Sequence, residues 1–93
     1  MKKTAMARHI LVNKEADAAL IKQRIKKGAD FASLAKKHST CSSAKRGGDL
    51  GEIRKGDLVA VVEKVVFQAP LKQVQGPIKS PFGFHVIEVY YRD

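Results

Sequence analysis

The stretch "SPFGFHVIEVYY", residues 80–91, is the most informative part of this sequence. Pro81 and Gly83 are turn residues, and the dense run of β-branched and aromatic side chains after them predicts a strand. Together with the segment "VQGPIKS" (74–80), this strand predicts a β-hairpin. The titratable ring of His85 stands at the start of the apolar strand and requires an explanation.

A second strand with a histidine is predicted near the other end of the sequence. In "TAMARHILV" (4–12), alternation places His9 and Leu11 on one face. If this strand pairs antiparallel with residues 83–91, His9 lies beside His85. Each buried imidazole needs partners for both ring nitrogens, which a second imidazole and a hydroxyl would supply, although each ring could also be satisfied separately. The candidate hydroxyls are those of Ser39, Thr40 and Ser80.

Two amphipathic helices are predicted after the first strand. The first spans 14–27 with Asn13 as its cap, and the second spans 31–39 with Asp30 as its cap. The next segment, 40–48, is small, polar and basic, which is typical of a loop. The apolar stripes are Ala18, Ile21 and Ile25 in the first helix and Phe31, Leu34, Ala35 and His38 in the second.

The middle of the chain is less clear. Residues 49–53 predict a short strand between glycines, whereas the β-branched content of 57–70 favours a strand but also fits a helix. The helical stripe would consist of Leu58, Val62, Val65 and Val66, with Asp57 as the cap. With either choice, the sequence predicts one α+β domain, residues 1–93, around one mostly antiparallel sheet.

The charge of the chain bears on its partners. The net charge is +9, and residues 1–28 hold 8 basic residues against 2 acidic ones. This excess indicates either a solvated helix face or a surface that contacts nucleic acid or the ribosome. The residues of that basic face are Lys22, Arg24, Lys26 and Lys27.

Cysteine usage and hydropathy predict the compartment. The only cysteine, Cys41, cannot form an intramolecular disulfide, which favours a reducing compartment. The stretch 1–12 is broken by Arg8 and His9 before it reaches the length of a signal peptide. No segment approaches the roughly 18 apolar residues of a membrane span. We therefore expect a cytoplasmic protein without membrane contact, and a monomer.

Other chemistries have weaker patterns in this sequence. A zinc site of His38 and Cys41 with His9 or His85 lacks CxxC or HExxH spacing. A thiol hydrolase built on Cys41 lacks a third orienting group and an oxyanion loop. The segment "RGGDLGE" (46–52) lacks the Lys-Ser/Thr of a phosphate-binding P-loop. We therefore expect no metal and no cofactor.

Five segments in a single register resemble the parvulin-type peptidyl-prolyl cis-trans isomerases. They are "HILV" (9–12), "GADFASLAKKHSTC" (28–41), "KRGGDLGEI" (45–53), "VEKVVF" (62–67) and "GPIKSPFGFHVIEV" (76–89). The size also resembles that of the minimal single-domain bacterial parvulins. The resemblance implies an α+β fold, parvulin/FKBP-like, with a four-stranded mostly antiparallel sheet surrounded by about four helices. It makes residues 58–67 a helix.

The resemblance also implies an activity and a set of site residues. The activity is non-covalent rotation of X–Pro bonds in unfolded or flexible chains, which assists folding and needs no cofactor. The family's polar active-site positions match His9, Cys41, Ser80 and His85. The substrate-binding positions, which form a socket for the proline ring, match Leu50, Leu58, Val62 and Phe82.

Some positions depart from the family pattern. The family usually has Met and Phe where this chain has Leu58 and Val62, and Ala60 replaces a common proline. The phospho-specific branch carries a basic loop after the first strand and a WW domain, neither of which has a counterpart here, so we expect no phosphate-directed recognition. The alternative function is a weakly catalytic binding module that uses the basic helix face on nucleic acid or ribosome.

Overall fold

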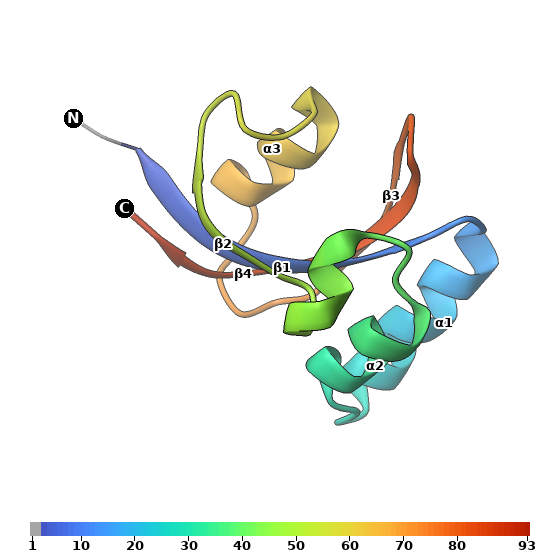
Figure 1. The fold of residues 1–93 in the computed structure, drawn as a ribbon. Coiled ribbons are helices and arrows are strands. Elements are labelled where there is room, and N and C mark those ends of the chain that lie inside the picture. The colour runs from blue at the N-terminus through green and yellow to red at the C-terminus, as the bar shows by residue number, and fades with distance from the viewer. Residues whose placement is uncertain (1–2) are drawn as a thin grey trace.

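The computed structural model describes residues 3–93, which form a sheet with helices on both faces (Figure 1). Met1 and Lys2, which the expected domain 1–93 and the signal-like stretch include, lie outside the described residues. The elements are β1 (Thr4–Val12), α1 (Glu15–Lys26), α2 (Phe31–His38), the 3-10 helix η1 (Ser42–Arg46), β2 (Asp49–Arg54), α3 (Ala60–Gln68), β3 (Gln75–Ser80) and β4 (Gly83–Arg92). The α+β class predicted from the sequence is confirmed, with three α-helices and one 3-10 helix around the sheet.

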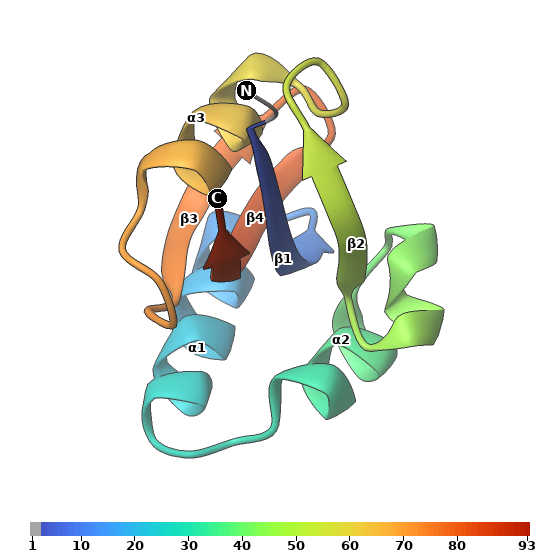
Figure 2. The same ribbon diagram turned by 90° about the vertical axis from the view of Figure 1, so that its left-hand side faces the viewer.

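The sheet has four antiparallel strands in the order β2-β1-β4-β3, as Figure 2 shows. The two central strands are therefore the first and the last in the chain. β3 and β4 form the predicted hairpin, in which Ser80 pairs with Gly83 across the turn Pro81–Phe82. At the other end of β4, Asp93 N donates to the Thr4 carbonyl at 3.0 Å, so the two ends of the described chain lie together.

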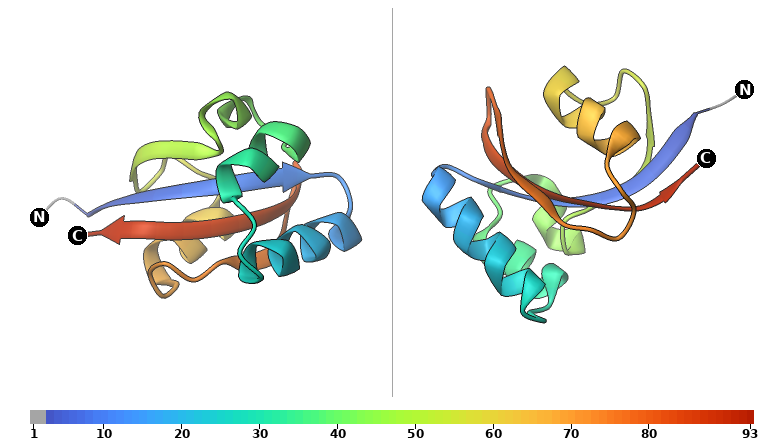
Figure 3. Two further views of the ribbon diagram at one scale, coloured as in Figure 1. Left: turned by 90° about the horizontal axis from the view of Figure 1, so that it is seen from below. Right: turned by 180° about the vertical axis from the view of Figure 1, so that it is seen from behind.

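Each face of the sheet has its own apolar cluster, because successive residues of a strand point to opposite sides. Helix α3 covers one face, and α1 and α2 cover the other (Figures 1 and 3). The α3 face buries Ala5, Ala7, Ile53, Val62, Val66, Ile87 and Val89. The opposite face buries Ile10, Val12, Ala18, Ile21, Phe31, Ala35 and Val86. The alternation predicted for the first strand is confirmed, since Ile10 and Val12 lie on the face opposite His9.

Two glycines allow neighbouring segments to approach the backbone of β1. A Cβ on Gly48 would lie 2.3 Å from the His9 carbonyl oxygen, and a Cβ on Gly83 would lie 2.5 Å from the Val12 carbonyl oxygen. Both glycines also have positive φ, a conformation that other residues rarely adopt. These approaches bring β2 and the hairpin against the strand that carries His9.

The ambiguous segment 57–70 is a helix over Ala60–Gln68, as the resemblance implies. Val62 and Val66 are buried against the sheet, which shows that a tertiary contact outweighs the strand preference of β-branched residues. The loop predicted at 40–48 contains the short helix η1. No helix in residues 3–93 is long and apolar enough to cross a membrane.

Two of the three predicted helix caps are wrong. Asp30 caps α2 as predicted, since its carboxylate accepts from Ser33 N at 2.9 Å. Helix α1, however, begins after Lys14 with no side-chain cap, so Asn13 does not cap it. Helix α3 begins after Val59, and Asp57 instead accepts a hydrogen bond from Arg54 N at 2.8 Å. Asp57 therefore closes the turn that leads out of β2.

Candidate functional site

A hollow of about 410 Å³ opens on the α3 face of the sheet. Its lining residues are His9, Leu11, Cys41, Leu50, Asp57, Leu58, Val59, Val62, Phe82 and His85. The volume is in the range of small-ligand pockets. The structure thus brings together seven of the eight site residues expected from the sequence, from five separate parts of the chain. The eighth, Ser80, contacts one of the lining histidines.

The two histidines form a buried pair on the sheet. His9 Nδ1 lies 3.1 Å from His85 Nδ1, and the rings stack with centroids 5.2 Å apart and 20° between their planes. In the β1–β4 ladder, Leu11 pairs with His85 and His9 pairs with Ile87, so the histidines are diagonal neighbours on one face. The expectation that the strands place the two rings side by side is confirmed.

Ser80 supplies the outer hydrogen bond of the pair. Its Oγ lies 2.6 Å from His85 Nε2 and accepts from Phe82 N at 3.1 Å. The other two hydroxyls predicted as partners do not contact the rings. Ser39 Oγ accepts from Leu11 N at 3.0 Å, and Thr40 Oγ1 donates to the Leu11 carbonyl. Both bonds hold the chain after α2 against the end of β1.

The pair can share only one proton between its two Nδ1 atoms. One ring must donate and the other must accept, so the contact is compatible with both rings being neutral, and only His85 has partners for both of its ring nitrogens. Burial lowers the pKa of His9 to about 4, with a further contribution from the neighbouring His85, and burial also lowers the pKa of His85. The pair is therefore uncharged at neutral pH. His9 Nε2 is buried without a hydrogen-bond partner in residues 3–93.

Cys41 is placed on the hollow by the chain segment that joins α2 to η1. Thr40 N donates to the Leu11 carbonyl at 2.8 Å, and Cys41 N donates to Ser39 Oγ at 3.3 Å. The thiol is free and half-buried. Its neighbours in the hollow are mostly apolar, and both nitrogens of His85 are already engaged by His9 and Ser80.

The apolar walls come from three elements. Leu50 belongs to β2, Leu58 and Val62 lie before and within α3, and Phe82 sits in the hairpin turn. Val62 is 2% exposed, so it belongs to the core as well as to the hollow. Phe82 is 64% exposed and stands at the rim of the hollow. An exposed ring at the rim of an apolar hollow favours contact with a ligand.

Three lining residues were not singled out by the sequence as part of the site. The alternation that places His9 on this face of β1 also places Leu11 there, so the sequence pattern could have identified Leu11 as a lining residue. Asp57 and Val59 lie in the connection between β2 and α3. No periodic pattern governs a connection of this kind, and only the folded geometry places them at the hollow.

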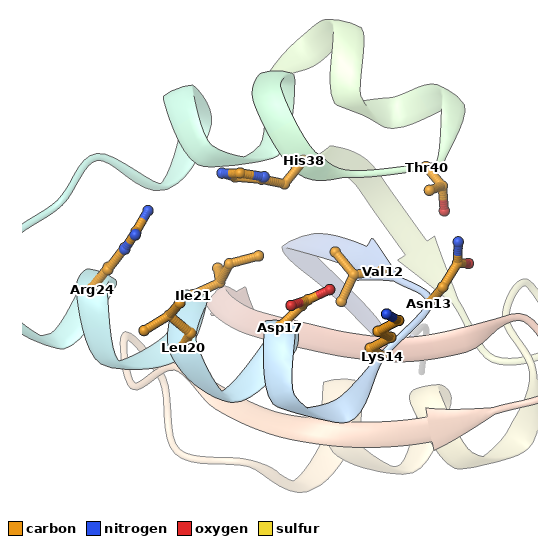
Figure 4. Close-up of a pocket in the computed structure, with 9 residues that line it drawn as sticks. All are labelled: Val12, Asn13, Lys14, Asp17, Leu20, Ile21, Arg24, His38 and Thr40. Carbon is orange, nitrogen blue, oxygen red and sulfur yellow. The ribbon is translucent and has the colours of Figure 1, made fainter.

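A second pocket lies between α1 and α2, on the opposite face of the sheet (Figure 4). Asp17 and Arg24 on α1 point across it towards His38 on α2. His38 Nε2 is buried without a hydrogen-bond partner in the described chain. This pocket combines charges of both signs with the aliphatic side chains of Val12, Leu20 and Ile21.

The basic face expected on α1 is smaller than predicted. Lys22 Nζ donates to the Gly76 carbonyl at 2.9 Å and is half-buried, so it ties α1 to β3. Arg24, Lys26 and Lys27 are exposed.

Comparisons with known proteins give one consistent result. The family described as "Rotamase: PPIC-type PPIASE domain" matches residues 3–90. The foldase protein PrsA of Exiguobacterium sibiricum is 45% identical over 85 residues, which cover 89% of this chain and 28% of that relative. The chain thus spans less than a third of the length of this curated relative.

Solved structures agree with that match. The crystal structure of the peptidylprolyl isomerase PrsA from Bacillus anthracis superposes with a TM-score of 0.95 at 34% identity, over 99% of this chain and 43% of that one. The solution structure of NmPin, the parvulin of Nitrosopumilus maritimus, superposes with a TM-score of 0.87 at 39% identity, over 98% of both chains.

Proposed function

This chain belongs to the family of PPIC-type peptidyl-prolyl cis-trans isomerases, the parvulins, and from this premise we propose that its α3-face hollow binds the proline ring of X–Pro segments and lets the preceding peptide bond rotate. The observation that carries the proposal is the hollow itself, an open apolar site with a neutral imidazole pair in its wall. Proline-containing segments of unfolded or flexible chains are the substrates, and assistance to folding is the outcome.

The reaction needs no covalent intermediate. Rotation about an X–Pro bond breaks amide resonance, with a barrier of roughly 18–20 kcal/mol for a peptide bond. The uncatalysed reaction takes tens to hundreds of seconds. An enzyme has only to bind the twisted amide more tightly than either planar form, and each tenfold gain in rate requires about 1.4 kcal/mol of such preference.

The walls and the polar residues have different roles in this proposal. Leu50, Leu58, Val62 and Phe82 hold the pyrrolidine ring away from water. A dry site favours rotation because the twisted amide is less polar than the planar one. The polar residues His9, Cys41, Ser80 and His85 fix the shape of the site and the electric field at the rotating carbonyl.

The lowered histidine pKa values support a structural role for the imidazole pair. Neutral rings that are hydrogen-bonded to each other and to Ser80 do not supply a proton at neutral pH. We assign them to the positioning of the site and do not treat them as acid–base catalysts.

Phosphate-directed recognition is not part of the proposal. The connection between β1 and α1 consists of Asn13 and Lys14 only, which leaves no basic loop. Asp57 at the hollow would repel a phosphate group.

The test is a protease-free isomerisation assay with Ala-Pro and Leu-Pro peptides, followed by chemical-shift mapping of the bound peptide. We expect faster exchange between the cis and trans forms, with shift changes at Leu50, Leu58 and Phe82. No acceleration for any peptide would refute the activity. Shift changes confined to the α1–α2 pocket would refute the site.

A second candidate function rests on the exposed bases of α1. Arg24, Lys26 and Lys27 lie together on the last turns of α1 and the residue after it, and they carry a share of the +9 net charge. Binding of RNA or duplex through this set predicts an affinity that falls steeply with added salt. The double variant K26Q/K27Q should weaken it, whereas Lys64→Gln on α3 should not. Absence of a saturable complex would contradict this function.

A monomer in the cytoplasm completes the proposal. The single free thiol supports a reducing compartment, because it has no second cysteine to pair with in the sequence. Recovery of the protein in an envelope fraction would contradict the compartment, and a mass above 10.2 kDa in sedimentation would contradict the monomer.

A further inference from the structure

We propose that Asp57 sets a charge preference at the hollow, so that a lysine or arginine beside the substrate proline is favoured over a glutamate or aspartate. The inference rests on the proposed function, since it concerns the same hollow. It adds a class of substrate and a residue that selects it.

Within residues 3–93, Asp57 is the single charged residue on the hollow. Of the ten lining residues, drawn from the described part of the chain, seven have apolar side chains or the thiol of Cys41, and two are histidines. The pKa values of both histidines are lowered, so neither carries charge at neutral pH. A peptide in the hollow therefore meets one formal charge on its walls, and that charge is negative.

The carboxylate is held at the rim by the turn it closes. Asp57 Oδ2 accepts from Arg54 N at 2.8 Å. The adjacent Gly56 N donates to the Glu63 carboxylate of α3. These bonds fix the turn against both β2 and α3, so the charge has a defined position and does not have to be ordered when the substrate binds.

The basic side chains next to Asp57 in sequence are directed elsewhere. The Arg54 guanidinium contacts Glu52 Oε1 at 3.4 Å. The Lys55 ammonium lies over the ring of Phe67, 5.8 Å from its centroid. Neither cation pairs with the Asp57 carboxylate, so that carboxylate remains available to a charged group on a substrate.

The net charge of +9 acts in the opposite sense, because it attracts acidic peptides. At about 0.1 M salt the Debye length is roughly 10 Å, so charges that lie farther than this from the hollow are largely screened. A preference for lysine would therefore have to come from a local carboxylate. An exposed pair of opposite charges typically changes an equilibrium by a factor of about 1.4 to 5.

The test compares peptides that differ only in the residue next to proline. Lysine, glutamate and alanine are placed before proline in one set and after it in a second set. In 0.1 M salt we expect kcat/KM for the lysine peptide to exceed that for the glutamate peptide by about threefold in at least one set. The ratio should approach one in 1 M salt, where the Debye length is about 3 Å, and in D57N. Asparagine keeps an oxygen that can accept from Arg54 N, so the turn is retained.

Glu15→Gln is the matched control, because Glu15 lies on α1, on the other face of the sheet, and its loss changes the net charge by the same amount. This variant should keep the threefold ratio. Equal rates for lysine and glutamate in both sets, or a ratio that D57N does not change, would overturn the inference. The alanine peptide separates the two proposals, since its acceleration tests the hollow without a charge beside the proline. If no peptide is accelerated, dissociation constants from chemical shifts still test the charge preference.

Discussion

The pair of His9 and His85 consists of two ionisable side chains that are uncharged at neutral pH and have a structural role. Each ring is buried, and the Nδ1 contact at 3.1 Å requires one donor and one acceptor. Ser80 completes the network on one side, and its backbone is set by the hairpin turn. The network joins β1, β4 and the end of β3 at the wall of the hollow, so its protonation affects the fold as well as the site.

Stability should fall when the pH is lowered from 7 to 5. The pKa of His9 is about 4 in the folded chain and about 6.5 when unfolded. The unfolded chain therefore binds the proton first, and the stabilisation present above about pH 6.5 is lost as the pH approaches 4. For His9 alone, we expect a loss of about 2 kcal/mol between pH 7 and pH 5, measured by urea unfolding. His85 adds to the loss in the same direction.

The matched variants for this prediction are His9→Gln and His38→Gln. Only the difference between the two pH values is compared within each variant, so a lower overall stability does not affect the result. His9→Gln should reduce the pH dependence, and His38→Gln, on the other face of the sheet, should retain it. An unchanged slope in His9→Gln would show that the pair does not govern acid sensitivity.

Replacing Cys41 by serine should leave most of the isomerase activity. In the proposed mechanism the thiol contributes to the polarity of the wall and forms no covalent bond. Serine is close in size and keeps a polar group, so kcat/KM should fall by less than about twofold, corresponding to about 0.4 kcal/mol of transition-state stabilisation. Loss of all activity, with a folded variant by circular dichroism, would instead identify Cys41 as a nucleophile.

The elements assemble around the backbone of β1. Gly48 and Gly83 bring other segments so close that a Cβ would touch carbonyl oxygens of that strand. The hairpin therefore cannot move away from β1 without opening the site that it helps to form. Phe82 in the turn and Ser80 at its base both depend on this approach.

Gly83→Ala should destabilise the protein more than Gly28→Ala. Both glycines have positive φ, +138° at Gly83 and +104° at Gly28, so an alanine at either position would strain the backbone and lower the stability. Only at Gly83 would the new Cβ also meet backbone, at 2.5 Å from the Val12 oxygen, whereas Gly28 has nothing within 4 Å. We expect the free energy of unfolding to fall by about 1 kcal/mol in G28A and by at least about 3 kcal/mol in G83A. Equal losses in denaturant unfolding would contradict the close approach.

Regular elements could be predicted well from this sequence because their patterns are local. The strand expected at 4–12 coincides with β1, and the capping aspartate of α2 is Asp30 as expected. Alternation also placed His9 and His85 on the same face. This prediction holds because the pairing of β1 with β4 is regular from His9 to Val12. The resemblance to the parvulins implied the helix at 58–67, within the segment 57–70 that periodicity left open.

The remaining features depend on contacts between distant segments. Ser39 binds the backbone of Leu11 and is therefore unavailable to an imidazole. Lys22 donates a hydrogen bond to a carbonyl of β3 and is therefore not part of the exposed basic face. Asp57 closes a turn and reaches the hollow in place of capping α3. Composition and spacing contain no signal for such pairings, because the partners are set only when the elements pack.

The whole molecule is organised by two apolar clusters that share the same strands. Val86 and Val89 of β4 are both fully buried, but they face opposite clusters. Both clusters include residues of β1 and β4, so the packing of one face is coupled to that of the other.

This shared sheet predicts a single unfolding transition. Val86→Ala and Val89→Ala should each lower the free energy of unfolding by about 2 kcal/mol, because each removes two buried methyl groups and leaves a cavity. Both variants should shift one common transition, seen equally by far-ultraviolet circular dichroism and by tyrosine fluorescence. Separate transitions for the two probes, or a variant that shifts only one of them, would show that the faces unfold independently.

The central position of β4 has a consequence for synthesis on the ribosome. The middle of the sheet stays empty until residues 83–92 have been made, because β1 has β4 as its partner along most of its length. At about 5–20 residues per second, the nascent chain waits roughly 4–16 s for that segment. During this interval β1 lacks its partner on the β4 side, and both apolar faces of the sheet are incomplete. A sheet whose first strand pairs with its last thus passes through a vulnerable stage before it is complete.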